Sequence, residues 1–250
     1  MLYLQKKVFM MLLLIIFLVT TSVYAVAQPS VDFDAKCREY GLVDVCSLDD
    51  DILVELKYAT EDNFMGENVY GTLTNAYLEP VFAQKVVRAQ EILKSRYPGY
   101  TLLIYDAARP ISVQRYMYSV VQGTAFENFV ADGSRGGRHN FGVAVDLTIA
   151  TNDGTPLDMG TALDEFSDAS AVKGTPDSAD ARTRNIDVYR VYINAMRDAG
   201  VISAVAAENR ILLMEVMCEA GLVPYRREWW HFEELISMDA TRKKYRLLDF

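Results

Sequence analysis

The chain has 250 residues, among them 34 acidic side chains, 25 basic side chains and only two histidines. A hydrophobic fraction of 51% with 24% charged residues excludes a wholly disordered or collagen-like chain, and the length suffices for one large domain or two small ones. The net charge of −9 argues against a nucleic-acid-binding protein, because that affinity depends mainly on Lys and Arg side chains that neutralise phosphates.

Residues 1–27 are predicted to be a cleavable export signal. Two lysines precede an apolar run over 8–19, and Ala25-Val26-Ala27 has the small-x-small pattern of a signal-peptidase site. An uncleaved membrane anchor is the alternative, but a run of about 12 residues is shorter than the roughly 20 that span a bilayer. We therefore expect an exported protein, periplasmic or secreted, with a mature domain over 28–250 and no stable membrane anchor. Loss of the two lysines would change the net charge from −9 to −11.

The remaining sequence mixes strand and helix patterns. In chain order we predict a strand over 51–58, a helix over 78–96, a strand over 101–105, a helix over 112–121, a strand over 143–149, a long polar loop over 151–185, helices over 187–199 and 209–220, and an apolar segment over 228–232. Neither an internal repeat nor a linker divides the chain, and the elements lack regular βαβ alternation. This order predicts a single α+β domain.

The three cysteines are spaced as follows. Cys37 and Cys46 lie nine positions apart near the predicted mature N-terminus and could form a disulfide in an oxidising compartment. Cys218 lies in an apolar helical pattern, which favours packing as a small hydrophobic side chain. The sequence has no C-x-x-C pair, which argues against a thiolate zinc site, and the odd count leaves at least one thiol unpaired.

His139 and Asp146 are seven positions apart, with Gly142 between them. They can converge if His139 closes a loop and Asp146 lies on the following strand, and both side-chain types are good zinc ligands. Asp146 is flanked by apolar residues in a predicted strand, where an unpaired charge is costly and requires a metal, a cation or hydrogen bonds. Taken alone, a His and an Asp at this spacing more often have a structural role.

The second histidine belongs to Glu228-Trp229-Trp230-His231-Phe232. An acidic side chain in such an apolar setting has a raised pKa, which suits a general base. The alternative is a core strand with a hydrogen-bonded histidine. Together the two segments supply His, Asp and His plus a spare Glu, and three protein ligands with one open position are typical of catalytic zinc. A site with three histidine ligands is excluded by the histidine count.

A third motif, Tyr105-Asp106-Ala107-Ala108-Arg109-Pro110, directly follows a predicted strand. An arginine at such a position can hold an anionic substrate or a developing oxyanion. Arg109 could equally form a solvated ion pair with Asp106.

Further segments extend this pattern over nearly all of the predicted mature chain. They are Lys57-Tyr58-Ala59-Thr60, Asp62-Asn63-Phe64-x-Gly66, Asp106-x-x-Arg109-Pro110, Gly142-x-Ala144-x-Asp146-Leu147-Thr148 and Met159-Gly160-x-x-x-Asp164. Together with His139-x6-Asp146 and Glu228-Trp-Trp-His231, they resemble the zinc D-alanyl-D-alanine dipeptidases, a group that includes the vancomycin-resistance dipeptidase. The resemblance implies a small antiparallel sheet flanked by helices, as in the hedgehog/D,D-peptidase architecture.

The resemblance also implies a metal centre and the groups that act on the scissile bond. One Zn²⁺ per chain would be bound by His139, Asp146 and His231. Glu228 would be the general base, and Arg109 would stabilise the tetrahedral transition state. The expected reaction is hydrolysis of the D-Ala-D-Ala dipeptide by a zinc-activated water, in the turnover of cell-wall peptides.

Substrate contacts are expected from Asp164, Tyr58 and Asp106, with Asp164 pairing with the α-ammonium of a small dipeptide. The sequence departs from the family at Gly137, where well-studied members have a serine near the substrate carboxylate, and over 126–138, which is shorter than in the resistance enzymes. The alternative enzyme is a D,D- or L,D-carboxypeptidase that trims peptidoglycan stem peptides. The alternative of another class is a non-catalytic zinc-containing binding module, and the oligomeric state stays open.

Overall fold

The computed structural model describes residues 31–173 and 182–250. The predicted export signal over 1–27 lies outside the described residues, as does the part of the predicted polar loop over 174–181. The fold below is that of the compact unit over 32–250. Among the described residues, no helix has both the length and the apolar character that crossing a membrane requires.

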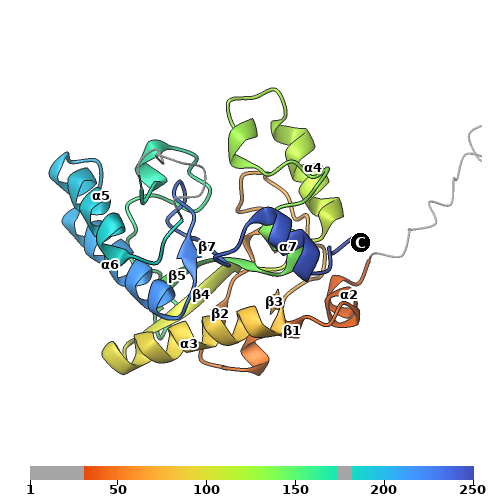
Figure 1. Cartoon of the computed structure of the whole chain (residues 1–250), viewed down its shortest axis with the longest axis horizontal. Coiled ribbons are helices and arrows are strands. Elements are labelled where there is room, and N and C mark those ends of the chain that lie inside the picture. The colour runs from red at the N-terminus through yellow and green to blue at the C-terminus, as the bar shows by residue number, and fades with distance from the viewer. Residues whose placement is uncertain (1–30, 174–181) are drawn as a thin grey trace, which may run out of the picture. The chain divides into compact units, whose positions relative to one another are not determined.

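A five-stranded sheet lies at the centre of this unit (Figure 1). Its strands, in spatial order, are β2 (Leu53–Val54), β4 (Tyr100–Asp106), β5 (Ala144–Thr151), β7 (His231–Glu233) and β6 (Val223–Pro224). β2 pairs in parallel with β4, and the other pairings are antiparallel. β4 and β5 are buried along almost their whole length, so polar side chains on them need partners.

Helices cover the sheet, and two further strands form a separate small sheet. The helices are α2 (Phe33–Glu39), α3 (Pro80–Arg96), α4 (Ile111–Val121), α5 (Ile186–Asp198), α6 (Ala204–Glu219) and α7 (Met238–Lys244), and the antiparallel pair joins β1 (Val43–Asp44) to β3 (Tyr77–Leu78). α3 and α6 pack against each other and against β4 and β5, and α5 packs on α6. In Figure 1, α3 and α4 lie on opposite sides of the sheet.

α3 illustrates how the sequence forms these elements. Its first residue is Pro80, which suits a position that needs no backbone N–H, and the Glu79 side chain caps the helix by accepting the Phe82 backbone N–H at 2.9 Å. The apolar residues Phe82, Val86 and Leu93 recur at helical spacing and are fully buried. The helix therefore presents one continuous apolar face to the core.

The predicted α+β fold is confirmed, and the elements predicted over 78–96, 101–105, 112–121, 143–149 and 187–199 match the structure to within two residues. Three details differ. The strand predicted over 51–58 is only β2, followed by a 3₁₀ turn at Lys57–Ala59, because β2 is an edge strand that pairs with β4 alone. The helix predicted over 209–220 begins at Ala204, where the Ser203 hydroxyl accepts the Ala206 backbone N–H. The sheet is mixed, because β2 and β4 are parallel.

All three cysteines lie among the described residues and are free. Cys37 and Cys218 are buried, and burial raises the pKa of each thiol to about 12, so both stay protonated at neutral pH. Packing of Cys218 as a small hydrophobic side chain is thus confirmed. The pairing of Cys37 with Cys46 is not formed in this structure.

Candidate active site

Three elements bring the predicted metal ligands together. His139 lies in the 3₁₀ helix Arg138–Phe141, Asp146 on β5 and His231 on β7, and the last two are direct partners in the antiparallel register. Gly142 ends the 3₁₀ helix with a φ of +67°, and a Cβ there would lie 2.9 Å from the Leu42 side chain. Only glycine therefore allows the reversal from His139 into β5 without strain.

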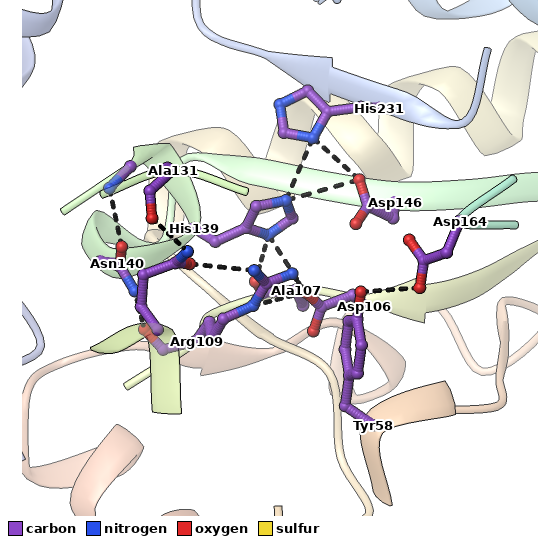
Figure 2. A network of polar contacts seen from close by, with 12 residues as sticks. Tyr58, Asp106, Ala107, Arg109, Ala131, His139, Asn140, Asp146, Asp164 and His231 are labelled. Atoms are coloured by element: carbon purple, nitrogen blue, oxygen red, sulfur yellow. Dashed lines mark hydrogen bonds and ion pairs between the residues drawn. The ribbon is translucent and has the colours of Figure 1, made fainter. Parts of the chain in front are cut away.

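The ligand atoms of these residues form a small triangle. His139 Nε2 lies 3.1 Å from His231 Nδ1 and 3.4 Å from Asp146 Oδ1, and His231 Nδ1 lies 2.9 Å from Asp146 Oδ1. Figure 2 shows the three side chains pointing toward one another. A tetrahedral zinc with bonds of about 2.0–2.2 Å holds its ligands roughly 3.3–3.6 Å apart. The triangle thus fits a tetrahedral ion with small adjustments, and a fourth position stays open for water or substrate.

The hydrogen bonds of His139 leave the correct nitrogen free. Its Nδ1 donates to the Ala107 carbonyl oxygen at 2.7 Å, so the Nε2 that faces the triangle is unprotonated when the ring is neutral. Burial raises the pKa of Asp146, but the Coulombic attraction and hydrogen bonds of the two histidines outweigh burial and hold this pKa well below its usual range. Asp146 is therefore an anion, as a metal ligand must be.

Arg109 lies at the cavity wall and is only 8% exposed. Its Nε and Nη2 donate to Asp106 Oδ2, and its Nη1 donates to the Gln114 amide oxygen at 2.9 Å. Tyr70 donates to the other oxygen of Asp106. Because a guanidinium has five N–H donors, these bonds fix Arg109 and leave donors for a ligand in the cavity.

Asp106, which is predicted to contact substrate, lies behind Arg109 in this structure. It is fully buried, it does not line the cavity, and both of its oxygens accept hydrogen bonds from Arg109 and Tyr70. The carboxylate is thus turned away from the cavity, and its two bonds from the guanidinium orient Arg109. Tyr70 and Gln114 were not singled out from the sequence, since a lone Tyr and a lone Gln give no local signal of such a role.

Asp164 lies across the cavity, next to Tyr58. Tyr58 Oη donates to Asp164 Oδ2 at 2.8 Å, as Figure 2 shows. Burial, with smaller contributions from Asp146 and Asp106, raises the pKa of Asp164 to about 7. Asp164 adopts a φ of +58°, which aspartate tolerates better than most residues. A cation beside this buried carboxylate would favour its anionic form and offset the cost of its burial.

The segment that bears Asp164 is fixed by a residue that the sequence did not reveal. Arg210 of α6 is fully buried, and it donates from Nε to the Met159 carbonyl oxygen at 2.7 Å and from Nη1 to the Ala169 carbonyl oxygen at 2.8 Å. Burial lowers its pKa to about 10. Thr161 of the same segment accepts the Trp229 indole N–H at 2.8 Å. These bonds tie the Asp164 segment to the helix and to the residue after Glu228.

Glu228 lines the same cavity and is 9% exposed. Its Oε2 lies 4.0 Å from His231 Nδ1, so the carboxylate is next to the triangle of ligand atoms without being part of it. Burial raises the pKa of Glu228 to about 8, against the opposing effect of His231. Burial thus moves this pKa from the acidic range toward neutral pH, where a general base is most effective.

The cavity has a volume of about 700 Å³. It is lined by all the predicted site residues except Asp106, namely Tyr58, Arg109, His139, Asp146, Asp164, Glu228 and His231. It is large enough for a small peptide, since ligand pockets typically enclose about 300–1,000 Å³.

A His–Asp–His cluster in which His139 and Asp146 are buried and His231 is partly buried, with an adjacent glutamate at one cavity, is the arrangement of a metallopeptidase. A family model described as D-Ala-D-Ala dipeptidase, of the peptidase M15 group, matches residues 38–245. The chain belongs to this family. It is therefore a hydrolase of the metallodipeptidase type, as predicted.

Individual relatives agree with the family assignment. The D-alanyl-D-alanine dipeptidase of Escherichia coli K12 is 30% identical over 192 residues, which cover 77% of this chain and 83% of the relative. That of Enterococcus faecium is 27% identical over 199 residues, covering 71% and 83%. That of Streptomyces coelicolor is 27% identical over 188 residues, covering 71% and 83%.

Proposed function

We propose that this protein is a zinc dipeptidase that hydrolyses D-Ala-D-Ala, with one Zn²⁺ held by His139, Asp146 and His231. The observation that carries the proposal is the convergence of these three ligand atoms within 3.4 Å of one another, beside Glu228. When bound, zinc supplies a Lewis acid that acidifies a water molecule and polarises the scissile carbonyl.

The side chains of the cavity have different roles in the hydrolysis of the peptide bond. Glu228 accepts a proton from the attacking water and passes it to the leaving amine. The free N–H donors of Arg109 stabilise the oxyanion that forms from the carbonyl oxygen, and loss of one such donor typically costs on the order of 10²–10³ in kcat. Asp106 and Gln114 hold the guanidinium in place, so its donors need no reorganisation during the reaction.

Asp164 selects for a free amino terminus. The Asp164 carboxylate would pair with the α-ammonium of a dipeptide, with the Tyr58 hydroxyl holding its Oδ2. An internal amide of a longer peptide has no cation to offer, so the desolvated carboxylate would lose its partner. This reasoning favours the dipeptide over a stem peptide as substrate. The relatives support this preference, since both are described as D-alanyl-D-alanine dipeptidases.

The test compares kcat/KM on D-Ala-D-Ala, on N-acetyl-D-Ala-D-Ala and on a pentapeptide stem that ends in D-Ala-D-Ala. We expect the free dipeptide to be preferred by about 10–100-fold, the cost of one unpaired buried polar group, and a chelator to abolish all turnover. Asp164→Asn should reduce the ratio of kcat/KM on the free dipeptide to kcat/KM on the two longer substrates. Equal rates on the stem and the dipeptide would support the carboxypeptidase alternative instead, and metal binding without turnover would support the binding module.

The pH dependence of activity should have an acid limb. Glu228 and Asp164 act as anions, and burial raises their pKa values to about 8 and about 7 in the metal-free protein. A bound divalent cation favours the anionic form and so lowers these values. Because a raised carboxyl pKa keeps the neutral form up to higher pH, kcat/KM should fall as pH decreases from about 7 to about 5. Asp164→Asn should make the limb less steep, and a wild-type profile that stays flat down to about pH 5 would contradict this expectation.

We propose further that residues 1–27 direct export, to the periplasm or the medium, where the enzyme would act in cell-wall peptide turnover. The proposal depends on the lysines, apolar run and Ala25-Val26-Ala27 site of the sequence. A mature N-terminus at Gln28 in protein recovered outside the cytoplasm is the expected result, and an intact Met1 there would contradict it.

A further inference from the structure

A second carboxylate lies behind one of the proposed metal ligands. His231 and Glu233 are two positions apart on β7, so their side chains point to the same face of the sheet, whereas Phe232 between them is fully buried. Glu233 Oε2 lies 3.4 Å from His231 Nε2, the ring nitrogen that points away from the triangle. Glu233 is 7% exposed, so solvent does little to satisfy its charge.

Two arginines fix this carboxylate. Arg138 Nε lies 2.9 Å from Glu233 Oε2, and Arg182 Nη1 donates to Glu233 Oε1 at 2.8 Å. Arg138 is itself held, because its Nη2 donates to the Ile236 carbonyl oxygen and its side chain is only 5% exposed. Arg138 also directly precedes His139 in the chain. The Glu233–Arg138 pair thus connects the segments that carry the two histidines.

The two histidines face the triangle with different nitrogens. His139 uses Nε2, and its Nδ1–H has a backbone partner, the Ala107 carbonyl oxygen. His231 uses Nδ1, which lies 2.9 Å from Asp146, so its proton must reside on Nε2 if Nδ1 is to bind a cation. Among the described residues, Glu233 is the acidic group that contacts this Nε2.

We propose that Glu233 is a positioning residue for the metal centre. It accepts the Nε2–H of His231, fixes the ring orientation and the tautomer, and increases the electron density on Nδ1. Arg138 and Arg182 balance its charge and keep the carboxylate in place. The proposal rests on the proposed zinc site, and it assigns to Glu233 a role in zinc affinity without contact to substrate.

The neighbouring residue provides a matched control. Glu234 is 6% exposed and its carboxylate is also ion-paired, with Lys85 Nζ at 2.7 Å. Within the described part of the chain, its side chain forms no ion pair or hydrogen bond with either histidine. Glu233→Ala and Glu234→Ala therefore each remove a buried, ion-paired carboxylate from adjacent positions. Only the first removes the partner of His231.

The readout is zinc affinity, measured by competition with a chromogenic chelator on the full chain. We expect Glu233→Ala to raise the zinc Kd by about 10–100-fold and Glu234→Ala to leave it within about twofold of wild type. Far-UV circular dichroism and melting in excess chelator report the metal-independent loss of stability in both variants. Equal zinc Kd values for Glu233→Ala and wild type, with both folded, would overturn the proposal.

Failure of the proposed function has a different signature. If wild type does not bind zinc in a 1:1 ratio, the metal site itself is wrong; if wild type binds zinc and Glu233→Ala binds it equally well, only the role of Glu233 is wrong. Glu233→Gln keeps the side-chain volume and replaces the alanine variant in this test if that variant does not fold. We expect it to raise the zinc Kd by about tenfold.

A measurement on the wild-type protein completes the test without any substitution. Because the chain has only two histidines, ¹⁵N-histidine labelling gives a spectrum of two imidazoles. In the zinc-loaded protein, His231 should carry its proton on Nε2 and show a downfield proton signal that exchanges slowly with water. A His231 protonated on Nδ1, or an Nε2–H in fast exchange with water, would contradict the hydrogen bond to Glu233.

Discussion

Replacement of Glu228 by glutamine should lower kcat on D-Ala-D-Ala by on the order of 10²–10⁴-fold while zinc stays bound in a 1:1 ratio. Glutamine has nearly the same shape but cannot accept the proton of the attacking water. The Glu228 carboxylate lies 4.0 Å from His231 Nδ1 and outside the triangle of ligand atoms, so its loss should not release the metal. Steady-state kinetics and metal analysis of the purified variant measure both effects.

Glu234→Gln is the control for this experiment. It makes the same chemical change at a glutamate of similar exposure, 6% against 9%, that pairs with Lys85 away from the ligand triangle. We expect the control to keep kcat within about twofold of wild type, because the Glu234 side chain pairs with Lys85 and does not line the cavity. A Glu228→Gln enzyme with kcat within tenfold of wild type would rule out Glu228 as the general base, and a variant without zinc would show that Glu228 also holds the metal.

His139→Ala and His231→Ala should each abolish stoichiometric zinc binding and lower kcat/KM by at least on the order of 10³-fold. Each substitution leaves two of three protein ligands, and the metal contributes several kcal/mol of transition-state stabilisation, where each 1.4 kcal/mol is a factor of ten. Zinc content after dialysis and kcat/KM on the dipeptide are the two measurements.

The two histidine variants are expected to have the same residual activity. The chain has no third histidine, so another imidazole cannot replace the lost ligand. Both variants should therefore fall to the residual activity of chelated wild-type protein. Stoichiometric zinc in either variant would remove that histidine from the ligand set, and unchanged activity in both would refute a metal mechanism at this cavity.

The structure explains which parts of the fold could be read from the sequence. α3 was predicted to within two residues because its periodic apolar residues and the following Pro98-Gly99 are local signals. The strand predicted over 51–58 was too long, because alternation of apolar residues does not show whether a partner strand is present. β2 pairs with β4 over two residues only, and its parallel direction is set by a connection that the sequence does not reveal.

The site residues divide in a similar way. His139, Asp146, Glu228 and His231 were identified because their residue types and order are rare, and the structure brings their side chains to one cavity. Asp106 was expected to contact substrate because it lies beside Arg109 in a family motif. Whether a carboxylate faces the cavity or the core depends on the twist and register of β4, where a register shift between residues 104 and 106 precedes the loop.

The sequence by itself determined the family, the α+β class, the histidine count and the set of residues that can bind a metal, because these depend on residue identity and local order. The tertiary structure decided which nitrogen of each imidazole faces the triangle, and it placed the Asp106 carboxylate against Arg109, outside the cavity lining. It also brought Glu233, Arg138 and Arg182 together behind His231. These relations depend on strand register and on contacts between segments up to about 90 residues apart, and no local pattern encodes such distances.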